Sequence, residues 1–197
     1  NDGGNNTFDG PTIFTGAGAL TINGTITVNA ATQPSTVPTI NGFIVLSNAS
    51  LTTSTINVAA NQYSPNNVAL AINANIALGG TVTSITKTGT GFLGIGGQSQ
   101  NLVGTTFNLN AGGLAYSPST GTATAILGSA VVMGANTTVD TRGNNQGTGY
   151  GGLVLGSVAS SNTSAVIMNG VQGTAGNLTT GLDNTSTAYA GSFASPY

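Results

Sequence analysis

Residues 68–78 read VALAINANIAL, the clearest strand pattern in the chain. Its apolar side chains, at every second position from Val68 to Leu78, alternate with alanine and asparagine. Because alternate residues of a strand point to opposite faces, the pattern predicts a strand with one face turned towards a core. Residues 20–28 repeat the pattern with threonine and asparagine on the polar face. Residues 43–46 form a continuous apolar run, which is typical of a strand covered on both faces.

The rest of the chain reads as short strands separated by glycine-rich turns. Further strands are predicted at residues 82–86, 92–96, 105–109, 130–133, 137–141, 152–155, 165–168 and 176–179. No helix is predicted, because glycine, threonine, asparagine and β-branched residues are poor helix formers and no apolar stripe of helical period persists. Asn23-Gly24, Asn41-Gly42 and Asn169-Gly170 fit either tight hairpin turns or the left-handed corners of a solenoid, since both need φ > 0.

Apolar residues recur at roughly 22 to 27 residues, the spacing of a solenoid coil of three short strands and three turns. The spacing is illustrated by Ile22, Val45 and Ile72, and by Leu109, Met133, Leu155 and Leu178. The phase slips between residues 95 and 109, where a longer loop or a further coil is expected. We expect an all-β chain in which residues 1–197 form a single parallel β-solenoid domain; the alternative is a β-sandwich of pilin or surface-layer type. Ile72 and Leu109 are expected to point inwards and Thr25 outwards.

One segment carries a motif of a known family. Residues 85–97 read ITKTGTGFLGIGG, and residues 101–114 read NLVGTTFNLNAGGL. The lysine with its spaced glycines, the asparagine before Gly-x-Thr and the closing Gly-x-Leu resemble the autotransporter-associated β-strand repeat, most clearly over residues 85–114. Leu102 and Val103 stand where that family usually carries an aromatic residue. The resemblance implies a right-handed parallel β-helix, export across an outer membrane and display at the bacterial cell surface, and it implies no catalytic residues.

The composition excludes most enzyme classes. The 197 residues include 31 glycines but only two basic and four acidic residues, with no histidine or cysteine, and none of the acids is glutamate. The common general bases, thiol nucleophiles and soft metal ligands are therefore missing, and we expect no enzymatic activity, no cofactor and no metal. One lysine and one arginine cannot neutralise the phosphates of a nucleic acid. No segment approaches the roughly 18 consecutive apolar residues of a membrane-spanning helix.

The few charged residues are the candidates for a functional site. They are Lys87, Arg142, Asp2, Asp9, Asp140 and Asp183. Asp140 and Arg142 together could bind a sugar, but a local ion pair on a solvated coil is the expected role. Glycoside hydrolysis would need Asp140 to meet a second aspartate. Lys87 belongs to the repeat motif, and we expect it to cover a turn or cap a ladder rather than to form a Schiff base or an isopeptide bond.

Two further patterns concern ligands and modification. Sequons occur at Asn5, Asn23, Asn48, Asn136, Asn162, Asn177 and Asn184. A chain this rich in asparagine and threonine produces such sequons by chance. Thr-x-Thr pairs, which are typical of flat ice-binding arrays, occur at Thr25/Thr27, Thr81/Thr83, Thr86/Thr88 and Thr88/Thr90. Their spacing shows no fixed register, so an ice- or carbohydrate-binding solenoid ranks as the third hypothesis.

The function expected first is a non-enzymatic structural or adhesive role in an extracellular protein of the bacterial surface. The second hypothesis is a dedicated subunit of an extracellular fibre, sheath or surface layer. Residues 1–10 and 188–197 contain no lysine or arginine, the side chains that often protect strand edges from pairing. We therefore expect a homo-oligomer or homopolymer, whose growth lysine at Thr12 or Phe193 should block.

Overall fold

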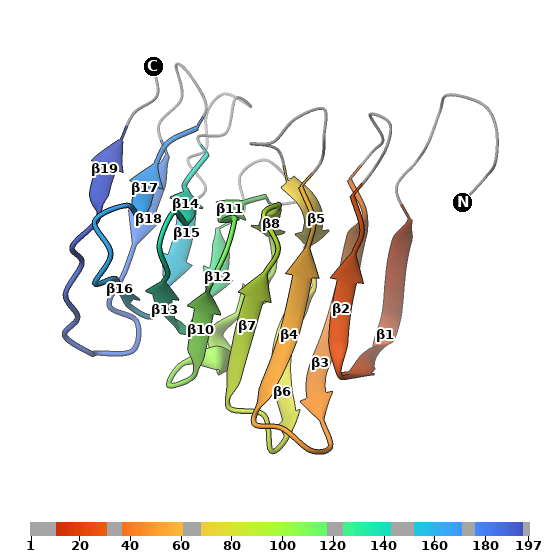
Figure 1. Cartoon of the computed structure of the whole chain (residues 1–197). Coiled ribbons are helices and arrows are strands. Elements are labelled where there is room, and N and C mark those ends of the chain that lie inside the picture. Colours follow the sequence, from red (N-terminus) through yellow and green to blue (C-terminus); the bar gives the residue numbers. More distant parts are fainter. Residues whose placement is uncertain are drawn as a thin grey trace, which may run out of the picture.

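A computed structural model describes residues 11–30, 37–60, 68–117, 124–142, 152–170 and 176–194. Within these ranges the chain is all β, and its single helical element is one short 3-10 turn, η1 (Gln100–Leu102). The strands stack in chain order along one axis, from β1 at one end to β19 at the other (Figure 1). The predicted absence of long helices is thus confirmed for the part of the chain that is described.

The strands form three parallel sheets, which we call A, B and C. Sheet A contains β1 (Thr12–Asn23), β3 (Thr39–Asn48), β5 (Val68–Ile72), β6 (Asn75–Gly80), β8 (Phe92–Ile95), β11 (Gly113–Tyr116), β14 (Thr138–Asp140), β17 (Val166–Met168) and β19 (Ser192–Ala194). Sheet B contains β2 (Thr25–Val28), β4 (Thr53–Val58), β7 (Ser84–Thr88), β10 (Thr106–Leu109), β13 (Ala130–Met133) and β16 (Val158–Ala159). Sheet C contains β9 (Gln98–Ser99), β12 (Ala125–Leu127), β15 (Gly152–Leu155) and β18 (Asn177–Thr179).

Every pairing between these described strands is parallel, and each strand pairs with strands of the neighbouring coils. From β8 to β16, each coil runs through a strand of sheet A, one of sheet C and one of sheet B, as in β11, β12 and β13. This arrangement is the expected parallel β-helix. The sandwich alternative is wrong, because such sandwiches are built from antiparallel strands.

Glycine at the corners lets the long strands of the first coils turn. Gly24, between β1 and β2, has φ +120°, and Gly42, inside β3, has φ +99°. These are backbone conformations that side chains with a Cβ rarely adopt. Asn23-Gly24 and Asn41-Gly42 are therefore solenoid corners and not hairpin turns. The phase slip predicted between residues 95 and 109 coincides with β9 and η1, which complete one coil.

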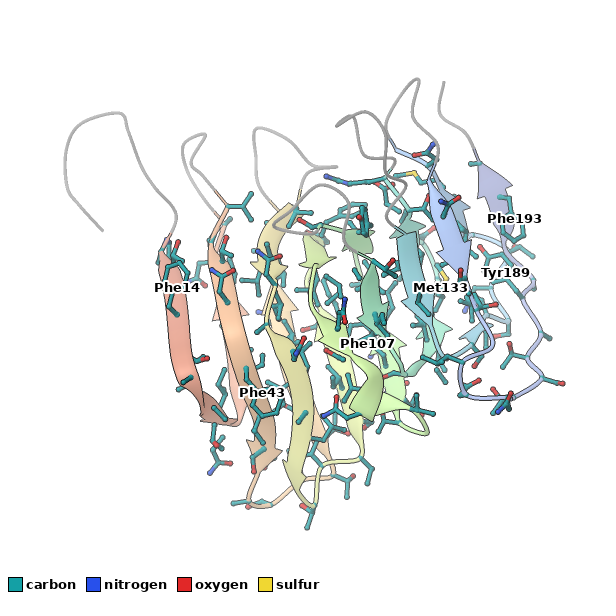
Figure 2. The ribbon with its side chains drawn as sticks, turned by 180° about the vertical axis from the view of Figure 1, so that it is seen from behind. Phe14, Phe43, Phe107, Met133, Tyr189 and Phe193 are labelled. Carbon is teal, nitrogen blue, oxygen red and sulfur yellow. The ribbon has the colours of Figure 1, made fainter. Side chains whose placement is uncertain are left out.

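The core is one continuous column enclosed by the three sheets. Ile72 and Leu109 are fully buried and Thr25 is exposed, so the predicted strand phase is confirmed at these three positions. Inward residues lie above one another in ladders, as in the register of Leu109 with Met133. Phe107 and Met133 lie inside the stack, whereas Phe14 and Phe193 lie at its two ends (Figure 2). Each fully buried leucine or isoleucine contributes about 1.5–3 kcal/mol to folding.

The strand predicted over residues 68–78 is divided into β5 and β6, and its register shifts between Val68 and Leu70. Because of this shift, Val68 does not share the inward face of Leu70 and Ile72. It packs instead in a small second cluster with Ala71, Phe92 and Ala115. The prediction of a strand with only one buried face is therefore wrong for β5, which is buried on both faces.

The predicted ladders are only partly right. Leu109 does lie beside Met133, but Leu155 belongs to sheet C and lies beside Leu127. Ile22 lies beside Leu46 and not beside Val45. Coils differ in length, because strand pairing between successive coils joins residues from 21 to 32 positions apart. Strands outside the predicted ranges are β4, β9, β11, β12, β16, β19 and the first half of β1.

Candidate functional site

Lys87 is buried among core side chains and not exposed on a turn. It lies in register between Ile56 and Leu109, and its side chain has no exposed surface. Its ammonium donates hydrogen bonds to the carbonyl oxygens of Thr88 at 2.9 Å, Gly89 at 2.6 Å and Ala111 at 2.9 Å. These three acceptors match the three donors of an ammonium group. Burial lowers the pKa of Lys87 to about 8.

Gly89, two residues after Lys87, shows why the motif places a glycine at this distance from the lysine. Gly89 has φ +74°, and a Cβ built there would lie 2.3 Å from the carbonyl oxygen of Val58 in the preceding coil. The turn after β7 therefore lies directly against that coil, and its carbonyl groups gather around the lysine. Lys87 covers a turn, as expected, but does so from inside the core.

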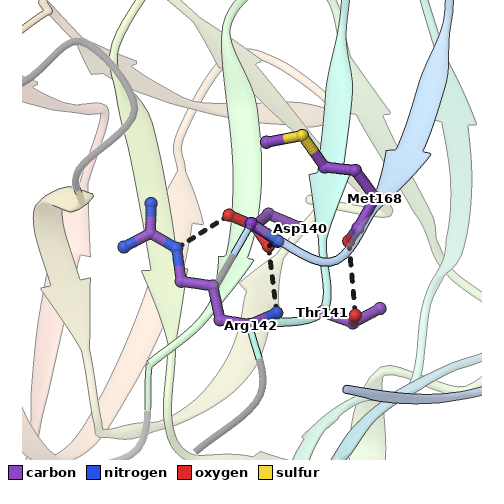
Figure 3. Close-up of polar contacts among 5 residues, drawn as sticks. Asp140, Thr141, Arg142 and Met168 are labelled. Atoms are coloured by element: carbon purple, nitrogen blue, oxygen red, sulfur yellow. Dashed lines mark hydrogen bonds and ion pairs between the residues drawn. The ribbon is translucent and has the colours of Figure 1, made fainter. Parts of the chain in front are cut away.

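Asp140 and Arg142 form the expected ion pair, with 2.8 Å between Arg142 Nε and Asp140 Oδ2 (Figure 3). Asp140 Oδ1 also accepts hydrogen bonds from the backbone N–H groups of Arg142 and Gly170, at 3.0 Å and 2.8 Å. Asp140 is only 1% exposed, and the Arg142 guanidinium lies 5.8 Å from the ring centroid of Phe92. The expectation of a solvated pair is wrong, because β14 and its neighbours bury the carboxylate. The pair joins adjacent coils.

The second described aspartate has different partners. Asp183 accepts hydrogen bonds from the hydroxyls of Ser157 at 2.9 Å and Thr185 at 2.8 Å. Burial raises the pKa of Asp183, but these hydrogen bonds outweigh burial and leave the pKa below its ordinary value. Asp2 and Asp9 lie outside the described residues. In the described ranges no cluster of three or more acidic, histidine or cysteine side chains could hold a metal ion.

Several asparagines of the sequons stabilise turns. The Asn48 side chain accepts hydrogen bonds from the backbone N–H groups of Ser50 and Leu51, each at 3.1 Å. Asn136 and Asn184 have positive φ, at 55° and 53°. Asparagine tolerates this backbone region and caps turns with its amide, which accounts for these residues without glycosylation. Asn5 lies outside the described residues.

At one end of the described stack, β1 and β2 are edge strands. β1 spans twelve residues and pairs with β3 alone among the described strands. Its exposed apolar residues include Ile13 and Phe14, the latter 76% exposed. Neither β1 nor β2 carries a charged residue. This edge offers a long row of backbone donors and acceptors beside apolar side chains.

At the other end, the stack finishes in β19, which pairs with β17. Phe193 is in register with Ile167 and continues the core ladder, yet it is 76% exposed. Its ring packs edge-on against Tyr189, with centroids 5.5 Å apart. A cleft of about 390 Å³ opens here between Phe193, Ile167 and Leu178. The last described coil thus leaves core side chains uncovered.

The sequence identified Thr12 and Phe193 as edge positions, and both lie on edge strands. It missed the apolar surface of β1, although the neighbouring Ile13 and Phe14 were a visible signal. No helix in the described residues is long and apolar enough to cross a membrane. Comparisons with protein-family models, curated proteins and solved structures give no significant match.

Proposed function

We propose that this chain is a non-enzymatic structural and adhesive section of an extracellular protein of the bacterial surface, which associates with further copies of itself through its strand edges. The observation that carries the proposal is the twelve-residue edge strand β1, which is uncharged and displays Phe14. An unprotected strand of this length is a template for pairing with another chain. The location rests on the composition and on the resemblance to the autotransporter passenger repeat.

The two edges are suited to meet each other. Among the described strands, β1 has one free edge and the exposed Ile13, whereas β19 has one free edge and Phe193. Parallel stacking of β1 on β19 of a second copy would continue the ladders across the junction. Such a contact joins different surfaces of the two copies, and repetition of it gives an extended filament. The net charge of −2 supplies little repulsion against this contact.

The charged side chains support a non-enzymatic role. Lys87 gives all three donors to backbone carbonyl groups, and Asp140 is bound by Arg142 and by two backbone N–H groups. Both residues stabilise the packing of coils, and neither faces the cleft near Phe193. Reproducible polysaccharide cleavage that Asp140→Asn abolishes would overturn this part of the proposal.

The experiment is to examine the purified 197-residue chain by negative-stain electron microscopy and by sedimentation at low and high salt. We expect filaments or oligomers that depend little on ionic strength, because backbone hydrogen bonds and apolar contacts are screened weakly. A chain that stays monomeric in both buffers at high concentration would overturn self-association. Long, regular fibres of this chain alone would favour a dedicated fibre subunit over an adhesive section.

A further inference from the structure

The outer face of sheet B carries a regular array of small polar side chains, which we call the hydroxyl face. It is contributed by β2, β4, β7 and β10, whose inward residues alternate with outward ones. Its members are Thr25, Thr27, Thr53, Thr55, Asn57, Ser84, Thr86, Thr88, Thr106 and Asn108. All of them are exposed or half-buried. No charged or aromatic residue belongs to this face.

The register of the strands aligns these residues in rows. Thr25 lies beside Thr55, Thr55 beside Thr86, and Thr86 beside Asn108. We call these four residues the central row. The pairs Thr25/Thr27 and Thr86/Thr88, which showed no common register in the sequence, are therefore aligned through β4. Unequal coil lengths hide this alignment in the sequence.

Hydrogen bonding differs between the central row and its flanks. On one flank the hydroxyls of Thr53 and Ser84 are 2.7 Å apart, and on the other Thr88 donates to Asn57 at 3.2 Å. In the central row, the hydroxyls of Thr25, Thr55 and Thr86 make no hydrogen bond to a described residue. The flanking bonds hold the strands together and leave the central hydroxyls available to an external ligand.

The spacing of the central row suits ordered water. Adjacent strands lie about 4.8 Å apart, so neighbouring hydroxyls repeat at about that distance. If a water oxygen lies about 2.8 Å from each of two neighbouring hydroxyl oxygens, the angle at the water between them is roughly 115–120°, close to tetrahedral. Threonine is stiff at χ1, so its hydroxyl keeps its position without much loss of entropy on binding. The row can therefore hold a line of waters in a geometry resembling that of a water crystal.

We propose that the hydroxyl face binds ice, with the central row ordering the first layer of water. This function is independent of self-association, because it uses the side of the stack and not its ends. Residues aligned in rows across four neighbouring strands suit an extended, periodic ligand better than a small molecule, whose sites are concave. The absence of aromatic rings removes the stacking platform on which a sugar ring could pack. The absence of charge removes groups that would keep their own hydration shells.

The test is partition of the whole chain into slowly growing ice. Thr55→Tyr places a large side chain in the middle of the central row while keeping a residue that strands favour. Thr179→Tyr, on the exposed face of β18 in sheet C, is the matched control. We expect wild type and Thr179→Tyr to enter the ice, and Thr55→Tyr to lose at least about tenfold in partition, a change of about 1.4 kcal/mol. Circular dichroism and melting temperature establish that each variant is folded.

Thr86→Tyr serves as the second variant if Thr55→Tyr does not fold, with the same expected loss. Exclusion of the wild-type chain from ice would overturn the proposal, as would equal partition of all variants. Cellulose and chitin pull-downs form a second arm of the test. Binding to a polysaccharide that Thr55→Tyr abolishes, without entry of the wild type into ice, would assign the face to carbohydrate and overturn ice binding. Filament formation is scored separately, so failure of either proposal is distinguishable from failure of the other.

Discussion

The ammonium group of Lys87 lies 2.9 Å from the carbonyl oxygen of Ala111, a residue 24 positions later in the next coil. The same group also binds the two carbonyl groups of its own turn. One buried lysine therefore links the turns of successive coils from inside the core. Its burial makes the free energy of unfolding depend on pH. The effect can be measured cleanly, because the chain has no histidine or cysteine that would titrate in the same range.

Stability should rise with pH between about 8 and 10. Burial lowers the pKa of Lys87 from 10.5 to about 8, so in this window the unfolded chain binds more protons than the folded chain. Stability increases with pH wherever the unfolded state binds more protons. We expect a gain of about 1.5 kcal/mol between pH 8 and 9.5, measured by urea unfolding.

Lys87→Met is the control for this titration, and its stability should stay flat over the same window. Measurements should remain below pH 10, because burial raises the pKa of Tyr116 and Tyr189, whose ionisation on unfolding lowers stability at higher pH. A wild type whose stability falls between pH 8 and 9.5 would contradict the lowered pKa of Lys87.

Aspartate in the core should be far more damaging than aspartate on the hydroxyl face. Ile72 and Leu109 are fully buried, so Ile72→Asp and Leu109→Asp would each bury an unpaired carboxylate and cost about 4–5 kcal/mol or more. Thr25→Asp places the charge in solvent and should cost less than about 1 kcal/mol. Thermal melting compares the three variants, and equal losses would reject the inward and outward assignment.

Alanine substitution at two glycines compares the cost of backbone strain alone with the cost of strain plus a steric clash. Gly89 and Gly104 both have positive φ, at 74° and 82°, but only Gly89 lies against another coil. Gly104→Ala meets no atom within 4 Å and should cost about 1–2 kcal/mol from backbone strain alone. Gly89→Ala must also displace the carbonyl group of Val58, so we expect a loss of about 3 kcal/mol or more in chemical denaturation. Equal losses would mean that the turn does not lie against the preceding coil.

Lysine on either edge strand should block association without unfolding the monomer. Thr12→Lys on β1 and Phe193→Lys on β19 would place a desolvated charge at the proposed junction. Leu51→Lys, in the exposed turn between β3 and β4, is the matched control. Sedimentation should show smaller species for both edge variants and wild-type behaviour for the control. Association that survives in both edge variants would point to another interface.

The all-β class of this chain is predictable from its sequence, because side-chain alternation indicates strands and the frequent glycine leaves no stable helix. The sequence favours a solenoid over a sandwich, but only the parallel pairing of the strands excludes the sandwich. The phase around Ile72, Leu109 and Thr25 follows from that alternation, since adjacent residues of a strand must face opposite ways. The turn at Asn23-Gly24 could also be located, because positive φ favours glycine, but the sequence left open whether it is a hairpin turn or a corner.

The neighbours that each residue has in successive coils could not be predicted from the sequence. The coils differ in length, so sequence spacing cannot set the register, and a shift of one position reverses the face of a strand. For this reason the pairing of Ile22 with Leu46, the outward turn of Val68 and the aligned central row were not predicted. The burial of Asp140 and the position of Lys87 inside the core were missed for a related reason. Polar residues are normally exposed, and only hydrogen bonds from their own turn and from the next coil make their burial possible.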